Sequence, residues 1–215
     1  MTSISIVGAT GLVGKQILLE AGRLQGRNRI RVWTRRPADL PIGSTGIVSH
    51  QAPSADSDFW QADVLFIALG TTIAKAGTRS AFRAIDFELV LECAKRARES
   101  QTRTLALVSA SGADPASRIF YSRVKGEAEA ALEALGFPRL VVARPSLLLG
   151  DRSERRAGEW LARKILGPSR ALFPKSIRPV RDAEVARVLM DTAMDPSWQG
   201  RRILSNRELL KKATR

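Results

Sequence analysis

Residues 8–14 read Gly-Ala-Thr-Gly-Leu-Val-Gly, and this glycine-rich segment lies between an apolar strand pattern at 3–7 and a helical pattern at 15–24. Glycine permits a tight turn, close approach of a ligand to the backbone, and close packing of helix on strand. The first N–H groups of such a helix have no partner within it and, with the helix dipole, favour an anion. The segment therefore predicts a βα turn that binds the pyrophosphate of a dinucleotide.

Strand and helix patterns keep alternating to about residue 150. Further strands are expected at 29–34, 47–49, 62–69, 104–108 and 140–143, and further helices at 80–100 and 121–135. The run at 62–69 is continuously apolar, which indicates a strand buried on both faces. Such alternation predicts right-handed βαβ units and a doubly wound parallel sheet, which is a Rossmann fold of the α/β class.

After Gly150 the pattern changes, because prolines interrupt it. Helices are expected at 158–166, 182–193 and 206–212, with a strand at 201–204. We expect one domain over 1–215, with a Rossmann core at 1–150. We expect 151–215 to be a short extension or lid on the substrate side, over the carboxyl end of the sheet, where open α/β folds bind ligands.

The end of the second strand indicates which dinucleotide is bound. A site that prefers NAD places an acid on the adenosine ribose, whereas this chain has Thr34-Arg35-Arg36. Two guanidinium groups suit a ribose 2′-phosphate, so NADP(H) is expected over NAD(H), with a solvated basic turn as the alternative. Glycine in Leu69-Gly70-Thr71 would let the backbone after the fourth strand approach the coenzyme.

The only tyrosine, Tyr121, stands four positions before Lys125. Residues at i and i+4 share one helix face, so the phenol and the ammonium can converge. A fixed cation favours the phenolate of a group that is otherwise a poor acid or base at neutral pH. Two serines, Ser109 and Ser111, stand at the end of the fifth strand, and their spacing of two residues places both on the same side of the strand. Two acids, Asp63 and Asp86, are interpreted as a structural cap and a surface salt bridge.

Composition excludes several classes of protein. The only histidine is His50 and the only cysteine is Cys93, so a His/Cys zinc site lacks ligands and no intrachain disulfide can form. No secretory signal or membrane-spanning run is visible, and a reducing cytoplasm is the expected location. The net charge of +14 is scattered, although 151–181 is richest in arginine. That segment lacks interleaved aromatic residues, so nucleic acid is not the expected partner.

These residues together resemble the short-chain dehydrogenase/reductase superfamily, in its atypical branch. More closely, the chain resembles the HIV Tat-interacting protein family of NADP-binding, oxidoreductase-like proteins. The stretches that carry the resemblance are GATGLVG at 8–14, ALGTTIAKAG at 68–77, VSASGAD at 108–114, YSRVKGEAEA at 121–130, ARPSLLLGDR at 143–152 and GEWLARK at 158–164.

The resemblance implies a role for each site residue. Tyr121 would donate or accept the proton, Lys125 would contact the nicotinamide ribose, and Ser109 or Ser111 would orient the carbonyl. We favour Ser111 facing the substrate and Ser109 on the coenzyme side. The loop at 144–146 would lie beside the nicotinamide. The residues expected to bind the coenzyme are Gly8, Thr10, Gly11, Leu12, Val13, Gly14, Arg35, Arg36, Leu69, Gly70, Thr71, Ser109, Tyr121, Lys125, Arg144 and Pro145.

The expected function is that of an NADP(H)-dependent enzyme that transfers hydride to or from a small carbonyl or alcohol. The alternative is an NADP(H)-binding regulatory or protein-interaction module with little catalysis. We expect no metal and no membrane insertion, and the sequence leaves open protein partners, a homodimer and the identity of the substrate.

Overall fold

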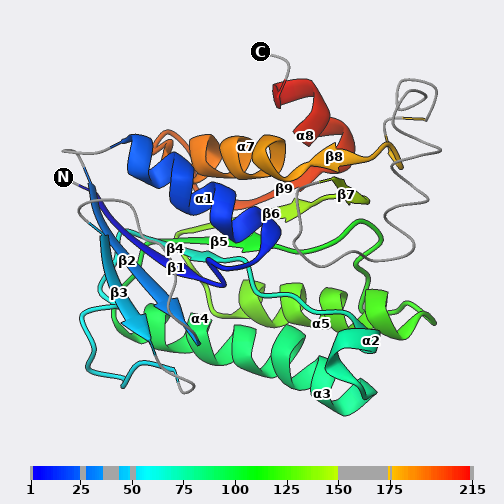
Figure 1. The fold of residues 1–215 in the computed structure, drawn as a ribbon, viewed down its shortest axis with the longest axis horizontal. Helices are drawn as coiled ribbons and strands as arrows, with labels where there is room; N and C mark the ends of the chain where they lie inside the picture. Colours follow the sequence, from blue (N-terminus) through cyan, green and yellow to red (C-terminus); the bar gives the residue numbers. More distant parts are fainter. Residues whose placement is uncertain are drawn as a thin grey trace.

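The structure is a computed structural model, and it describes residues 2–24, 28–35, 44–48, 52–149, 174 and 176–213. Figure 1 shows three layers, in which one sheet lies between two groups of helices. The fold class predicted from the alternating patterns is confirmed.

Seven strands form the central sheet, and every neighbouring pair in it is parallel. Their order in space is β3-β2-β1-β4-β5-β6-β9. Their bounds are β1 (Thr2–Val7), β2 (Asn28–Thr34), β3 (Ser44–Val48), β4 (Val64–Ile67), β5 (Thr104–Val108), β6 (Arg139–Arg144) and β9 (Gly200–Ser205). The direction in which successive strands are added reverses between β1 and β4. In open α/β sheets such a switch point opens a crevice at the carboxyl ends of the strands.

Each face of the sheet is covered by its own helices (Figure 1). One face carries α1 (Leu12–Arg23), α7 (Asp182–Met194) and α8 (Asn206–Ala213). The other carries α2 (Ile73–Ala76), α3 (Arg79–Arg83), a π-helical turn η1 (Ala84–Glu88), α4 (Leu89–Glu99) and α5 (Phe120–Ala134). Because α3, η1 and α4 are continuous, the single helix predicted for 80–100 exists with a π turn inside it.

Side-chain alternation along the strands divides the core into two layers. In β4, Val64 and Phe66 belong to the cluster under α1 and α7, whereas Leu65 and Ile67 belong to the cluster under α4. All four side chains are at most 1% exposed. The continuous apolar run therefore does mark a strand that is buried on both faces.

The part of the chain after residue 173 differs from the expected lid. Strand β9 pairs with β6 as the seventh strand, and α7 packs against α1. A second, small sheet joins β7 (Leu148–Leu149) to β8 (Val180–Arg181). Residues beyond 150 therefore complete both the sheet, through β9, and one of its helix layers, through α7. The helix expected at 158–166 lies outside the described residues.

Candidate active site

The glycine turn after β1 is in direct contact with the end of β4. Gly8 has a φ of +85°, and a Cβ atom added there would lie 2.7 Å from the backbone carbon and oxygen of Ala68. A Cβ at Gly14 would lie 2.1 Å from the carbonyl oxygen of Gly8. A side chain at Gly8 would therefore push apart the two loops at the switch point, and one at Gly14 would push helix α1 away from the turn that precedes it. The backbone here forms a narrow cradle that only glycine permits.

Helix α1 begins at this cradle. Its N-cap residue, Gly11, has extended backbone and no side chain to cap the helix, and its N–H donates to the carbonyl oxygen of Gly8 at 3.0 Å. The N–H groups of Leu12 and Val13 are in the first turn, where intrahelical acceptors are lacking. The residues of this turn, Gly8, Thr10, Gly11, Leu12, Val13 and Gly14, stay predicted coenzyme contacts. Their arrangement fits the pyrophosphate of a dinucleotide.

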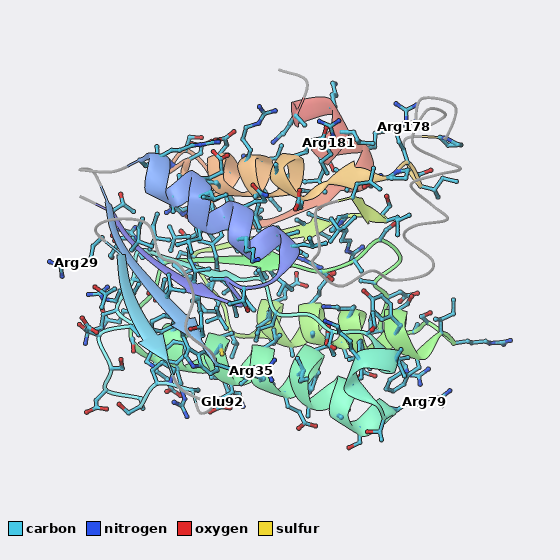
Figure 2. All side chains as sticks on the ribbon, in the orientation of Figure 1. Arg29, Arg35, Arg79, Glu92, Arg178 and Arg181 are labelled. Carbon is cyan, nitrogen blue, oxygen red and sulfur yellow. The ribbon has the colours of Figure 1, made fainter. Side chains whose placement is uncertain are left out.

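Arg35 directly follows β2 and is exposed at the tip of that strand (Figure 2). It is therefore free of the core at the position where a dinucleotide's adenosine ribose is expected. Arg36 lies outside the described residues. Of the other arginines that Figure 2 labels, Arg79 lies on α3 and Arg29 on β2, whereas Arg178 and Arg181 both lie near β8.

A buried ion pair lies beside the loop after β4. Lys125 Nζ is 2.7 Å from Asp86 Oδ1, and the two side chains are 6% and 0% exposed. The other carboxylate oxygen, Oδ2, accepts a hydrogen bond of 3.0 Å from the backbone N–H of Thr71. A Cβ added to Gly70 would lie 3.8 Å from the Asp86 carboxylate and 3.9 Å from Lys125 Nζ. The sequence interpretation of Asp86 as a surface salt bridge is therefore wrong, because the pair is buried.

Tyr121 lies in the first turn of α5, one helical turn before Lys125, and it is half-buried. Its ring packs against Phe82, with 5.5 Å between the ring centroids. Gly126 follows Lys125 and allows the loop that precedes α5 to pack directly against the helix, since a Cβ there would lie 2.2 Å from the backbone of Asp114 and Pro115. Helix α5 thus carries the phenol and the ammonium on one face, as the spacing predicted.

The two candidate serines have different surroundings. Ser109 is 7% exposed, and its hydroxyl donates to Glu129 Oε1 at 2.6 Å. Ser111 is exposed, and its backbone N–H donates to the carbonyl oxygen of Pro145 at 2.8 Å. The hydroxyl of Ser109 therefore already has a partner within the protein, whereas Ser111 is exposed to solvent.

The side chain of Arg144 also forms an ion pair with Glu129. Its guanidinium donates from Nε at 3.0 and 3.1 Å and from one terminal nitrogen at 2.6 Å, a bidentate arrangement. Arg201 from β9 lies 3.4 Å from the same carboxylate. Glu129 is 1% exposed, so two cations and a hydroxyl compensate its burial. In this arrangement the Arg144 guanidinium is directed at α5, while its backbone begins the loop to Pro145.

Sequence reasoning missed the roles of Asp86, Glu129 and Asn206. Asp86 stands four residues after Phe82 on the buried face of the helix, and this spacing was a usable signal. Glu129 stands four residues after Lys125 in the same way. Asn206 is 3% exposed; its Oδ1 accepts from the backbone N–H of Ser146, and its Nδ2 donates to the carbonyl oxygen of Arg178. Nothing local in the sequence marks that contact.

A separate cavity of about 450 Å³ lies at the opposite, amino edge of the sheet, beside Ser3 and Asp63. There Asp63 Oδ2 accepts from the backbone N–H and hydroxyl of Ser3 at 2.8 and 2.9 Å, so this acid ties β1 to the start of β4.

No described group of three His, Cys, Asp or Glu side chains could hold a metal. Among the described helices, none has the length and apolar character to cross a bilayer.

Comparison with solved structures places the fold in a class. MoeE5 in complex with UDP-glucuronic acid and NAD superposes with a TM-score of 0.71, at 17% identity over 99% of this chain and 81% of that one. The human epimerase family protein SDR39U1 with NADPH gives a TM-score of 0.60, at 16% identity over 96% and 77%. A short-chain dehydrogenase/reductase superfamily protein from Agrobacterium tumefaciens with bound NAD gives 0.67, at 14% identity over 94% and 77%. The architecture is that of NAD(P)-binding Rossmann proteins of the short-chain dehydrogenase/reductase type.

Sequence relatives narrow this class to a family. HTATIP2 from Rattus norvegicus is 34% identical over 217 residues, which span 97% of this chain and 88% of the relative. FMP52, mitochondrial, from Debaryomyces hansenii is 34% identical over 92% and 90%. The chain belongs to the family of HTATIP2 and FMP52, an atypical branch of the short-chain dehydrogenases/reductases, as the resemblance predicted. No protein-family model matches it.

The expected cytoplasmic location is contradicted. The relatives from Debaryomyces hansenii and Candida albicans, and that from Emericella nidulans at 36% identity, are all named mitochondrial proteins. This finding points to the mitochondrion. The argument from Cys93 failed because one buried, unpaired thiol is compatible with more than one compartment.

Proposed function

We propose that this protein is an NADP(H)-dependent oxidoreductase that interconverts a small carbonyl compound and its alcohol. The observation that supports this best is one chain of contacts at the carboxyl edge of the sheet. The glycine turn touches the end of β4, the loop after β4 touches the Asp86–Lys125 pair, and Lys125 lies one turn from Tyr121. A coenzyme seated on the glycine turn and running along the loop after β4 would reach the phenol.

Two glycines support the binding of a coenzyme. Gly11 leaves the start of α1 without a side-chain cap, and Gly70 places no side chain of its own between the loop after β4 and Lys125. The exposed guanidinium of Arg35, with Arg36 after it in sequence, suits a 2′-phosphate and supports NADP(H) over NAD(H). When bound in its reduced form, the coenzyme supplies the hydride that reduces the carbonyl carbon.

The side chains of the protein supply the proton and the orientation. The Tyr121 hydroxyl gives its proton to the carbonyl oxygen, and solvent then restores that proton to the phenolate. The ammonium of Lys125 would hold the nicotinamide ribose by the N–H groups that are not directed at Asp86. The hydroxyl of Ser111 donates a hydrogen bond to the substrate oxygen, because that of Ser109 is already held by Glu129. In the other direction, the phenolate of Tyr121 accepts the proton of the alcohol.

Calorimetric titration of the folded protein with NADPH and with NADH tests this proposal. We expect NADPH to bind about ten-fold more tightly, as for one added charge-assisted contact. Folded protein that takes up neither coenzyme contradicts the proposal. Oxidation of NADPH across a panel of small aldehydes and ketones then separates an enzyme from a binding module, which would bind NADPH and oxidise none of it.

A further inference from the structure

We propose that the substrate is a carbonyl compound with an apolar chain of several carbons, and that Ile119, Leu147 and Ile177 contact this chain. This inference rests on the proposed function and names the class of substrate that the same site takes. It starts from the large apolar side chains that are exposed in the described part of the chain, which are Leu19, Leu24, Ile73, Ile119, Leu147 and Ile177. Single exposed residues of this kind are ordinary, whereas a group of them in one place marks a binding surface.

Three of these residues follow three neighbouring strands. Ile73 is the first residue of α2 after β4, Ile119 is the N-cap of α5 after β5, and Leu147 follows β6. Because β4, β5 and β6 are adjacent parallel strands, the segments that follow them leave the sheet at the same edge. This is the edge at which Tyr121 and Ser111 lie, so the exposed aliphatic residues gather on the side of the expected substrate.

Leu147 lies on a loop that contacts the serine of the candidate site. The backbone N–H of Ser111 donates to the carbonyl oxygen of Pro145 at 2.8 Å. Leu147 comes two residues later, a step of at most about 7 Å along the chain. Its side chain is 42% exposed. An apolar side chain is thus open to solvent close to the hydroxyl that we expect to bind the substrate oxygen.

Ile177 is held next to the same loop by an internal network of hydrogen bonds. The Ser146 hydroxyl donates to the carbonyl oxygen of Arg178 at 2.6 Å, and Asn206 Nδ2 donates to the same oxygen at 2.8 Å. Asn206 is buried, and its Oδ1 accepts from the N–H of Ser146 at 2.9 Å. The segment before β8 is therefore fixed against the loop after β6. Ile177, which precedes Arg178, is nevertheless 58% exposed.

Ile119 lies on the other helix layer, two residues before Tyr121. It is 67% exposed. Figure 1 shows the start of α5 and the β7–β8 pair at the same end of the molecule, on opposite sides of the central sheet. A carbonyl group held by Tyr121 and Ser111 would therefore direct its attached chain between Ile119 and the residues near β7 and β8.

An apolar chain gives these exposed side chains a partner. A chain that covers them removes apolar surface from water on both sides, and each fully buried methylene adds about four-fold in affinity. A polar chain would gain little from the same contacts, because its hydroxyl groups would lose water without finding hydrogen-bond partners there. The apolar character of the surface therefore favours an alkyl chain over a sugar.

The first test is a series of straight-chain aldehydes from propanal to octanal. In each case the hydride of NADPH goes to the carbonyl carbon and the proton of Tyr121 goes to the oxygen, which gives the primary alcohol and NADP⁺. Only the chain length changes along the series. We expect kcat/KM to rise about two- to four-fold for each of the first few methylenes. Glyceraldehyde, which has the three carbons of propanal and two hydroxyl groups, should have a lower kcat/KM than propanal.

A second readout separates binding from turnover. The amides from propanamide to octanamide have the same chains, and their carbonyl group is not reduced by hydride transfer. Tyr121 is the only tyrosine, so ¹³C labelling of the tyrosine ring gives one resonance that reports the surroundings of the phenol. Titration of this resonance, with and without NADPH, gives the dissociation constant of each amide. We expect the affinity to rise with chain length by the same factor as kcat/KM.

Three variants assign the effect to residues. Leu147→Ser and Ile177→Ser should each lower the gain per methylene to less than about two-fold, because each removes an apolar contact. Leu19→Ser is the matched control, since Leu19 is 52% exposed on α1 and lies away from the candidate site. It should keep the wild-type gain per methylene.

Several outcomes overturn the inference. They are wild-type kcat/KM and amide affinity that do not depend on chain length, an unchanged gain per methylene in both Leu147→Ser and Ile177→Ser, or an equal loss in Leu19→Ser. Wild-type protein that binds neither coenzyme overturns the proposed function itself. Protein that binds NADPH and reduces glyceraldehyde better than any alkyl aldehyde supports the proposed function and overturns only the apolar substrate.

Discussion

The hydroxyl of Ser109 donates a hydrogen bond of 2.6 Å to Glu129, which is 1% exposed and also accepts from Arg144. This contact joins the end of β5 to the middle of α5, the helix that carries Tyr121 and Lys125. It also distinguishes the two serines at the end of β5, because only Ser111 has an exposed side chain. This difference in hydrogen bonding supports the proposal that Ser111, and not Ser109, contacts the substrate.

We expect Ser111→Ala to lose catalytic activity and Ser109→Ala to lose stability. Ser111→Ala should lower turnover on an active carbonyl substrate at least ten-fold and leave the melting temperature unchanged, since one hydrogen bond to the substrate oxygen is lost. Ser109→Ala should lower the free energy of unfolding by about 1–3 kcal/mol, because Glu129 loses a buried donor. Steady-state kinetics and urea unfolding on both variants check this, and the reverse pattern would assign the substrate contact to Ser109.

Tyr121→Phe should abolish turnover and keep NADPH affinity within a few-fold. The ring remains packed on Phe82, while the group that exchanges the proton is gone. General acid–base groups contribute about 10²–10⁴-fold to rate, so a loss of that size is expected. Stopped-flow oxidation of NADPH with a confirmed substrate measures it. Turnover at the wild-type rate would exclude Tyr121 as the proton donor.

Arg35→Gln should weaken the binding of NADPH by about ten-fold, the scale of one charge-assisted contact, and leave NADH unaffected. The guanidinium is exposed after β2, so its loss should not disturb the core. Parallel titrations with the two coenzymes provide the measurement. Arg29→Gln, also exposed on β2, is the matched control and should change neither affinity. An equal loss for both coenzymes in Arg35→Gln would argue against a 2′-phosphate contact.

Gly8→Ala should destabilise the protein more than Gly136→Ala. Both glycines have positive φ, at +85° and +65°, so each variant carries a strain of about 1–2 kcal/mol. Only Gly8 also meets the backbone of Ala68, which adds an overpacking cost of about 1–3 kcal/mol. Thermal unfolding compares the two. Equal losses would mean that the loops after β1 and β4 are not in close contact.

Stability should depend on the pH above 9 through Cys93. Burial raises the pKa of the Cys93 thiol to about 12 from its ordinary value of 9.0, with a smaller contribution from Glu92. The unfolded chain therefore releases this proton first, so the stabilisation is complete below pH 9 and is lost as the pH rises from 9 through 12. At pH 10 the loss is about 1.4 kcal/mol. Urea unfolding at pH 7 and pH 10 should show this extra loss in wild type and not in Cys93→Ala.

Much of the fold could be predicted because its signals are local. Strands such as 104–108 are short apolar runs between turns, and the glycines at 8–14 fix where the first helix begins. The fourth strand was predicted too long, at 62–69, since apolar residues continue past the hydrogen-bonded part at Val64–Ile67. The two-residue strands β7 and β8 were missed, because so few residues carry no detectable period.

The site was predictable only as far as sequence spacing extends. Tyr121 and Lys125 are four residues apart, so one helix places both. Asp86 reaches Lys125 from another helix, and Arg201 reaches Glu129 from a strand 72 residues away. A pattern of apolar positions does not record which buried acid meets which buried base. Those partners follow from tertiary packing, which the sequence specifies only through the whole fold.

Strand β9 shields the outer side of β6 along all six of its residues, from Arg139 to Arg144. A shortened chain that stopped before Gly200 would leave that row of peptide groups open to solvent and to neighbouring molecules. Strand β9 is itself an edge strand, but it carries Arg201 and Arg202, and charged side chains on an edge hinder pairing with another chain. Strand β6 carries Leu140, Val141, Val142 and Ala143 in their place, so we expect the shortened chain to associate with other copies more readily.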